Sequence, residues 1–356
     1  MKIKDFQKTL QAKNCDFAFF YNLDSSNYNP NFYYFSGFNG LGALVIPKNK
    51  RPFLIAPKME FERARQSMIN KVYEMDKKKF FDSVRHIVRK NKIRPKKIAI
   101  DNTNFNLNSF KHFRKHFKKS KFNDVVPDCI KLREIKTDKE IEYLKKSCAY
   151  ADRILQKTIR NFRNFRTESD VAAFLVYETK KLGLELSFNP IVASGSNGSM
   201  PHYEPGNVKL KKGLCVIDFG VKYSGYCSDI TRTVSIGKPN DGQKKAYGML
   251  LKIQRDVIKK IEPGKNCSEL YEFVCTSLGK YKNNFTHGLG HGVGVEIHEM
   301  PNLTLNSKDK IQNNMAFTIE PGIYFPGKFG IRIEDTVLFK NKVEVLTKTN
   351  KKLIVV

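Results

Sequence analysis

The chain has 356 residues, 40% of them hydrophobic, which is enough for two domains of ordinary size with separate cores. Its formal net charge is +29, but the basic excess is spread over both halves of the sequence, which disfavours nucleic acid as the main partner. No apolar run is long enough to cross a membrane and the first residues do not resemble a secretory signal, so we expect a cytoplasmic protein without a membrane partner.

Seven cysteines are scattered along the sequence, and none of them forms a CxxC pair. An odd number with irregular spacing indicates reduced thiols and not a disulfide framework. Cys215 and Cys227 lie in apolar runs typical of strands, so we interpret them as buried packing residues and not as nucleophiles.

The first third of the sequence alternates short apolar runs with helical patterns, which predicts a small α/β domain over residues 1–128. The expected strands are 16–23, 41–46, 51–57 and 96–101, and the expected helices are 60–70, 80–92 and 107–120.

A second domain is predicted over residues 129–356. Thr137 and Glu140 form a capping box that begins a long helix, and Thr167 with Asp170 begins another, which ends near Gly183. Strand-like runs follow at 213–220, 226–237, 315–324 and 330–339. Two further helices are expected at 241–261 and 267–281. The turn between the first two strands predicts a hairpin.

Four carboxylates lie in strands that otherwise look buried: Asp218, Asp229, Glu320 and Glu334. A buried carboxylate requires a cation, a proton or a hydrogen-bonded partner. Structural salt bridges are one solution, because the chain has 64 lysines and arginines. Four carboxylates with one histidine from the glycine-rich stretch 285–301 would instead suit two divalent cations such as Mn²⁺, Co²⁺, Fe²⁺ or Zn²⁺. Such cations make bound water a nucleophile near neutral pH.

The motifs around these residues resemble those of the pita-bread metallopeptidases, the family of methionine aminopeptidase, aminopeptidase P and prolidase. The resemblance rests on "DFGVKYSGYCSDITRT", "THGLGHGVGVEIHE", "TIEPGIY" and "GIRIEDT", which occur in the family's order. It implies an α+β fold, in which a small α/β creatinase-type N-terminal domain precedes a pita-bread catalytic domain.

The resemblance also implies a set of metal ligands. Asp218 would bind one metal ion, Asp229 and Glu334 would bridge both ions, and His291 and Glu320 would complete the second. Glu320 would serve in addition as the general base and proton carrier.

The remaining site residues are likewise implied by the resemblance. His298 would contact the scissile carbonyl oxygen, and His202 would face the first residues of the substrate or the leaving nitrogen. His287 and Arg332 match substrate-binding positions of the proline-specific branch. We expect the glycines of the stretch to let the backbone approach metal and substrate closely, at positions 288, 290, 292 and 294.

The N-terminal domain favours the Xaa-Pro branch. The expected enzyme is therefore a dinuclear metallopeptidase, forming a homodimer by resemblance, that cleaves peptides with proline at the second position. Aminopeptidase P and prolidase remain open alternatives at this point. The more distant alternatives are a methionine aminopeptidase and a non-catalytic, basic relative that binds nucleic acid.

Overall fold

The computed structural model describes residues 2–24, 29–76 and 79–356. The chain divides into two compact units, Met1–Leu132 and Arg133–Val356. The boundary predicted between residues 128 and 129 falls inside helix α6 (Val126–Glu134), which spans this division. No helix within the described ranges is long and apolar enough to cross a membrane.

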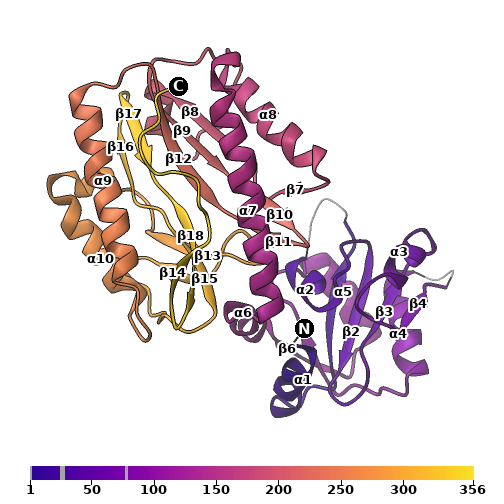
Figure 1. Cartoon of the computed structure of the whole chain (residues 1–356). Coiled ribbons are helices and arrows are strands. Elements are labelled where there is room, and N and C mark those ends of the chain that lie inside the picture. Colours follow the sequence, from indigo (N-terminus) through magenta and orange to yellow (C-terminus); the bar gives the residue numbers. More distant parts are fainter. Residues whose placement is uncertain (1, 25–28, 77–78) are drawn as a thin grey trace. The chain divides into compact units, whose positions relative to one another are not determined.

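The N-terminal unit contains a six-stranded mixed sheet in the order β4-β3-β2-β1-β5-β6 (Figure 1). Its outer strands run parallel to their neighbours, whereas β1, β2 and β3 pair antiparallel. The strands are β1 (Phe17–Asn22), β2 (Gly42–Pro47), β3 (Phe53–Ala56), β4 (Val72–Glu74), β5 (Lys97–Ile100) and β6 (Lys121–Asp124). The four strands expected in this region are therefore present.

Aromatic packing dominates the core of this unit. Phe19 on β1 stacks on Phe113 with ring centroids 4.4 Å apart, and Phe17, Phe53 and Phe81 belong to the same buried cluster. The helices are α1 (Ile3–Ala12), α2 (Pro30–Ser36), α3 (Phe61–Arg65), α4 (Phe80–Lys90) and α5 (Leu107–His116).

The C-terminal unit places two pairs of helices on the outer sides of its strands (Figure 1). Capping boxes begin three of these helices, at Thr137, Thr167 and Asn240. The first two are the starts predicted from the sequence. The helices are α7 (Asp138–Arg160), α8 (Glu168–Lys181), α9 (Asp241–Lys259) and α10 (Cys267–Leu278).

Two sheets form the two halves of this unit. The first has the order β12-β9-β8, and its apolar side chains form one core with α7 and α8. The second has the order β14-β13-β15-β18-β19 and shares a core with α9 and α10. The strands are β8 (Ile191–Ser194), β9 (Gly213–Phe219), β12 (Ile230–Ile236), β13 (Gly290–Gly292), β14 (Glu299–Leu303), β15 (Met315–Ile319), β18 (Asp335–Lys340) and β19 (Lys342–Val345).

Three predicted long strands are interrupted. The stretch 226–237 is divided, because its first residues form β11 (Tyr226–Cys227), which pairs with β10 (Val221–Tyr223) in a small sheet with β7 (Glu185–Leu186). The rest of the stretch forms β12, which pairs with β9 and places Thr231 opposite Asp218. The predicted hairpin is confirmed, because β10 pairs antiparallel with β11 across the turn at residues 224–225 and β9 pairs antiparallel with β12, but its two strands are interrupted.

The other two interruptions lie opposite each other. Pro321 has no N–H to continue the ladder, and β15 gives way there to β16 (Gly322–Phe325). On the neighbouring segment, β17 (Phe329–Arg332) is separated from β18 by two residues, and β16 pairs with β17. The sequence analysis placed Glu320 and Glu334 within strands. In the structure they lie at these two breaks.

Candidate metal centre

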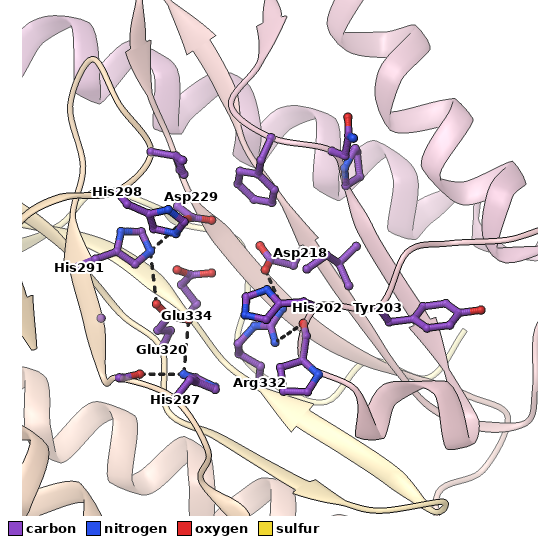
Figure 2. A pocket seen from close by; sticks show the side chains of 18 of the residues that line it. His202, Tyr203, Asp218, Asp229, His287, His291, His298, Glu320, Arg332 and Glu334 are labelled. Atoms are coloured by element: carbon purple, nitrogen blue, oxygen red, sulfur yellow. Dashed lines mark hydrogen bonds and ion pairs between the residues drawn. The ribbon is translucent and has the colours of Figure 1, made fainter. Parts of the chain in front are cut away.

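The four carboxylates and one histidine singled out in the sequence line a single cavity of about 480 Å³. Asp218 comes from β9, and Asp229 lies in the two-residue gap before β12. Figure 2 shows these side chains directed toward one another from segments far apart in the sequence. Three ligand atoms, one each from Asp229, His291 and Glu334, lie within 4.8 Å of one another.

His291 lies between two carboxylates. Its Nε2 is 3.5 Å from Asp229 Oδ2 and 3.4 Å from Glu320 Oε1 (Figure 2). Its Nδ1 lies 3.1 Å from the Gly292 carbonyl oxygen, which can only accept, so the proton of the neutral ring belongs on Nδ1. The Nε2 lone pair then faces the oxygens of two carboxyl groups, an arrangement that a cation would stabilise.

Two buried carboxylate oxygens have no hydrogen-bond partner among the described residues, Asp218 Oδ1 and Asp229 Oδ1. Leaving such an oxygen unsatisfied is costly, and the cost is greater for an ionised group. Unpartnered oxygens beside an unprotonated imidazole nitrogen are the donor set that borderline divalent cations prefer.

Burial sets the pKa values of this cluster. It raises the pKa of Asp229 well above its ordinary value, and the neighbouring Glu334 carboxylate adds to the shift. Burial likewise raises the pKa of Glu334 well above its usual range, with Glu320 and Asp218 contributing. The pKa of Glu320 is raised mainly by burial, whereas burial lowers the pKa of His291. Without a cation, the cluster therefore favours bound protons.

Arg332 is buried and donates hydrogen bonds to protein groups in several directions. Its Nη2 lies 2.6 Å from Asp218 Oδ2, which leaves the other oxygen of that carboxylate free. Its Nη1 donates to the Tyr324 hydroxyl at 2.8 Å, and its Nε donates to Thr231 Oγ1 at 3.1 Å. These contacts indicate that Arg332 holds Asp218 in place, in addition to lining the cavity as predicted.

His287 lies at the end of this chain of hydrogen bonds. Its Nδ1 lies 2.7 Å from the Gly288 carbonyl oxygen, so its Nε2 accepts from the Tyr324 hydroxyl at 2.9 Å. Burial lowers the pKa of His287, which agrees with a neutral ring. His287 Nδ1 is also 4.0 Å from Glu320 Oε2, within the candidate centre.

The two remaining predicted histidines also line the cavity. His202 and His298 are both exposed, and the His298 ring is packed edge-on against His291 with centroids 4.4 Å apart. Figure 2 shows His202 beside Arg332 and His298 beside His291. All nine site residues predicted from the sequence therefore line one cavity.

The glycine-rich stretch approaches neighbouring backbone. An added Cβ at Gly290 would lie 2.0 Å from the Thr318 carbonyl oxygen, and one at Gly292 would lie 2.0 Å from that of Met300. These two glycines therefore allow β13 to fit between its neighbouring strands. The sequence analysis had given them a different role, a close approach of the backbone to metal and substrate.

Several residues that contact the predicted set were not identified from the sequence, among them Thr231 and Tyr324. The Thr231 hydroxyl donates to Glu334 Oε2 at 2.7 Å, and the Tyr324 hydroxyl joins Arg332 to His287. Thr231 lies two residues after Asp229, and alternate residues of an extended segment share a face. This spacing could have identified Thr231 from the sequence.

Comparison with known proteins agrees with this geometry. Metallopeptidase family M24 matches residues 142–341, and the creatinase/prolidase N-terminal domain matches residues 2–135. The chain is 36% identical to the Xaa-Pro dipeptidase of Pyrococcus furiosus, covering 91% of this chain and 92% of the relative. It resembles the X-Pro aminopeptidase structure from Thermotoga maritima with a TM-score of 0.90 and 33% identity, covering 98% and 100% of the two chains. The prolidase of Pyrococcus horikoshii OT3 gives a TM-score of 0.89 at 32% identity, covering 99% of each chain.

The chain therefore belongs to metallopeptidase family M24, a family of hydrolases that use divalent metal. Within that family it groups with the Xaa-Pro peptidases. The predicted pita-bread catalytic domain and creatinase-type N-terminal domain are confirmed.

Proposed function

We propose that this protein hydrolyses the peptide bond before a proline at the second position of a peptide, using two divalent cations. The observation that carries the proposal is the cluster of four carboxylates and His291, with two buried oxygens that lack partners. The relatives named Xaa-Pro dipeptidase and X-Pro aminopeptidase support the choice of bond.

The five residues fit a pair of cations, because each offers a ligand atom to the same cavity. Asp218 would hold one cation through its free Oδ1 while Arg332 holds Oδ2. Asp229 and Glu334 would be shared between the cations, and His291 and Glu320 would hold the second. Four carboxylate charges would balance two divalent ions, which suits Mn²⁺, Co²⁺, Fe²⁺ or Zn²⁺.

Bound cations would lower the pKa of a water molecule and polarise the scissile carbonyl. Glu320, whose Oε1 lies 3.4 Å from His291 Nε2 in the cavity, would take a proton from the attacking water and return it to the leaving nitrogen, as the family resemblance implies. His298 would donate to the oxygen of the scissile carbonyl as negative charge develops there. His202 and His287, which also line the cavity, would contact the substrate.

Metal analysis combined with a peptide assay tests this proposal. We expect about two divalent ions per chain, release of the first residue from Ala-Pro substrates, and loss of turnover on chelation. A Met-Ala-Ser peptide should remain intact, which would exclude a methionine aminopeptidase. A metal-free protein that binds nucleic acid and hydrolyses none of these peptides would contradict the proposal.

The family resemblance also implies a homodimer, which light scattering of the purified protein would test.

Substrate length gives a first specific prediction. We expect a higher kcat/KM for Ala-Pro-Ala than for Ala-Pro, because the free carboxylate of the dipeptide would approach Glu204, an exposed acid lining the cavity. Arg332, an arginine that lines the cavity, already donates to Asp218 and Tyr324. Ala-Pro-amide is the control, since it removes the charge without adding length. Faster hydrolysis of Ala-Pro than of both other substrates would contradict this prediction and indicate a dipeptidase.

A further inference from the structure

A network of buried polar groups lies behind the candidate centre. Its centre is an ion pair between Arg232 and Asp335, which are 2% and 0% exposed, with Nη2 2.7 Å from Oδ1. Asp335 also accepts hydrogen bonds from three other side chains. They are Gln254 at 2.9 Å, Thr347 at 2.9 Å and Lys351 at 2.6 Å.

Arg232 connects three segments of the chain through their backbone carbonyls. Its Nη1 donates to the carbonyl oxygens of Thr231, at 2.9 Å, and of Glu334. Its Nε and Nη2 donate to the carbonyl oxygen of Thr349 at 3.0 and 2.7 Å. The guanidinium therefore ties β12 and the break between β17 and β18 to the C-terminal segment 347–351.

Two of the three carbonyl groups that Arg232 holds belong to Thr231 and Glu334, at the candidate centre. Thr231 donates its hydroxyl to Glu334 Oε2 at 2.7 Å, and the Glu334 amide donates to the Thr231 carbonyl at 3.1 Å. Arg232 and Asp335 each follow one of these residues in sequence. Since successive side chains in an extended strand point to opposite faces, the ion pair lies behind the carboxylate it supports.

We propose that Arg232, Asp335 and the C-terminal segment 347–351 form a positioning unit that fixes Glu334 and Thr231 in the geometry needed to bind metal. Glu334 lies at a break between strands, so its ladder contacts alone do not fix its backbone. The supporting segment lies beyond residue 341, where the match to the peptidase family ends. This inference rests on the proposed metal site.

A purely structural network would behave differently on substitution. Replacing a buried ion pair changes stability by an amount that depends on its packing, and it need not change ligand affinity. Partners that orient a metal ligand instead change metal affinity, by about 10- to 100-fold when they are removed. Measuring both Mn²⁺ affinity and melting temperature of a variant therefore distinguishes a positioning role from a purely structural one.

The test is Asp335→Asn, which keeps the shape of the side chain and removes the charge shared by Arg232 and Lys351. We expect Mn²⁺ affinity, measured by calorimetry on the chelator-treated full-length protein, to fall by about 10- to 100-fold. Lys351→Met is the milder variant, because this lysine lies at the edge of the network with its side chain 19% exposed. It should weaken Mn²⁺ binding in the same direction, and it decides the question if Asp335→Asn does not fold.

Asp101→Asn is the matched control. Asp101 is a buried carboxylate of the N-terminal unit, where it accepts from Asn31 Nδ2 and Asn104 Nδ2, both at 2.9 Å. Its loss should lower the melting temperature while leaving Mn²⁺ affinity within about threefold of the original, because it shares no hydrogen-bond partner with Arg232, Asp335 or segment 347–351. Wild-type affinity in both Asp335→Asn and Lys351→Met, with lowered melting temperatures, would overturn the inference. Absence of Mn²⁺ binding by the wild-type protein would instead overturn the proposed function.

Discussion

Replacing Asp229 with asparagine is expected to lower kcat/KM for Xaa-Pro substrates by about 10³-fold or more, the size seen when one member of a catalytic unit is removed. The substitution keeps the shape of the side chain but removes a negative charge at the point where His291 and Glu334 converge. Metal binding should fall with activity, because a neutral amide is a poorer ligand for a hard or borderline cation. The measurements are steady-state kinetics and metal content of the purified variant.

The same substitution should make the metal-free protein more stable. The pKa of Asp229 is raised by burial and by neighbouring carboxylates, so its charged form is unfavourable when no cation is present. We expect a melting temperature several degrees above that of the metal-free wild-type protein, since about 1 kcal/mol corresponds to 2–4 °C in a domain of this size. Asp256→Asn, at a partly exposed position on α9, is the control and should change activity not at all and stability only by the small contribution of its ion pair with Lys252. A fully active Asp229→Asn protein would contradict the assigned role.

Metal addition is expected to stabilise the protein more at pH 8 than at pH 5. Asp229, Glu320 and Glu334 have raised pKa values, so the folded metal-free state retains protons that the unfolded chain releases. Their contribution is favourable below the ordinary carboxylate pKa and is lost as pH rises toward the raised values. His291 acts in the opposite sense because its pKa is lowered, but three carboxylates oppose one imidazole.

Cations replace those protons, so their effect grows where the protons would otherwise be lost. With free metal at 100 times its dissociation constant, the gain is about 2.7 kcal/mol. Thermal unfolding of chelator-treated protein at pH 5, 6.5 and 8, with and without Mn²⁺, would measure it. If Mn²⁺ raised the melting temperature by the same amount at all three pH values, the role of the carboxylate cluster would be contradicted.

The sequence was sufficient to predict a set of residues that line one cavity, but not their local backbone. Strand alternation and apolar neighbours singled out Asp218, Asp229, Glu320 and Glu334 as buried acids, because a buried carboxylate has few compatible environments. The same apolar neighbours suggested unbroken strands. In the structure three of the four acids lie at interruptions, where the chain leaves one sheet for another. Local pattern does not encode which of several sheets a strand will join.

Contacts between segments that are distant in the sequence also could not be predicted. Arg232 looked like one of many basic residues in a chain with net charge +29, yet it is buried against Asp335 and Thr349. Tyr324 lies in an apolar run, and only the fold shows that its hydroxyl joins Arg332 to His287. These roles depend on which segments meet across the unit, and no periodicity in a single segment carries that information.

In the proposed enzyme, the reaction requires two divalent cations, which are held by Asp218, Asp229, His291, Glu320 and Glu334. The most direct test is metal stoichiometry by mass spectrometry on protein reconstituted with Mn²⁺, in parallel with Ala-Pro-Ala hydrolysis. We predict two ions per chain in the wild-type protein, fewer in Asp229→Asn and Glu334→Gln, and activity that rises with occupancy. Undiminished hydrolysis by protein that has been stripped of metal would contradict the account.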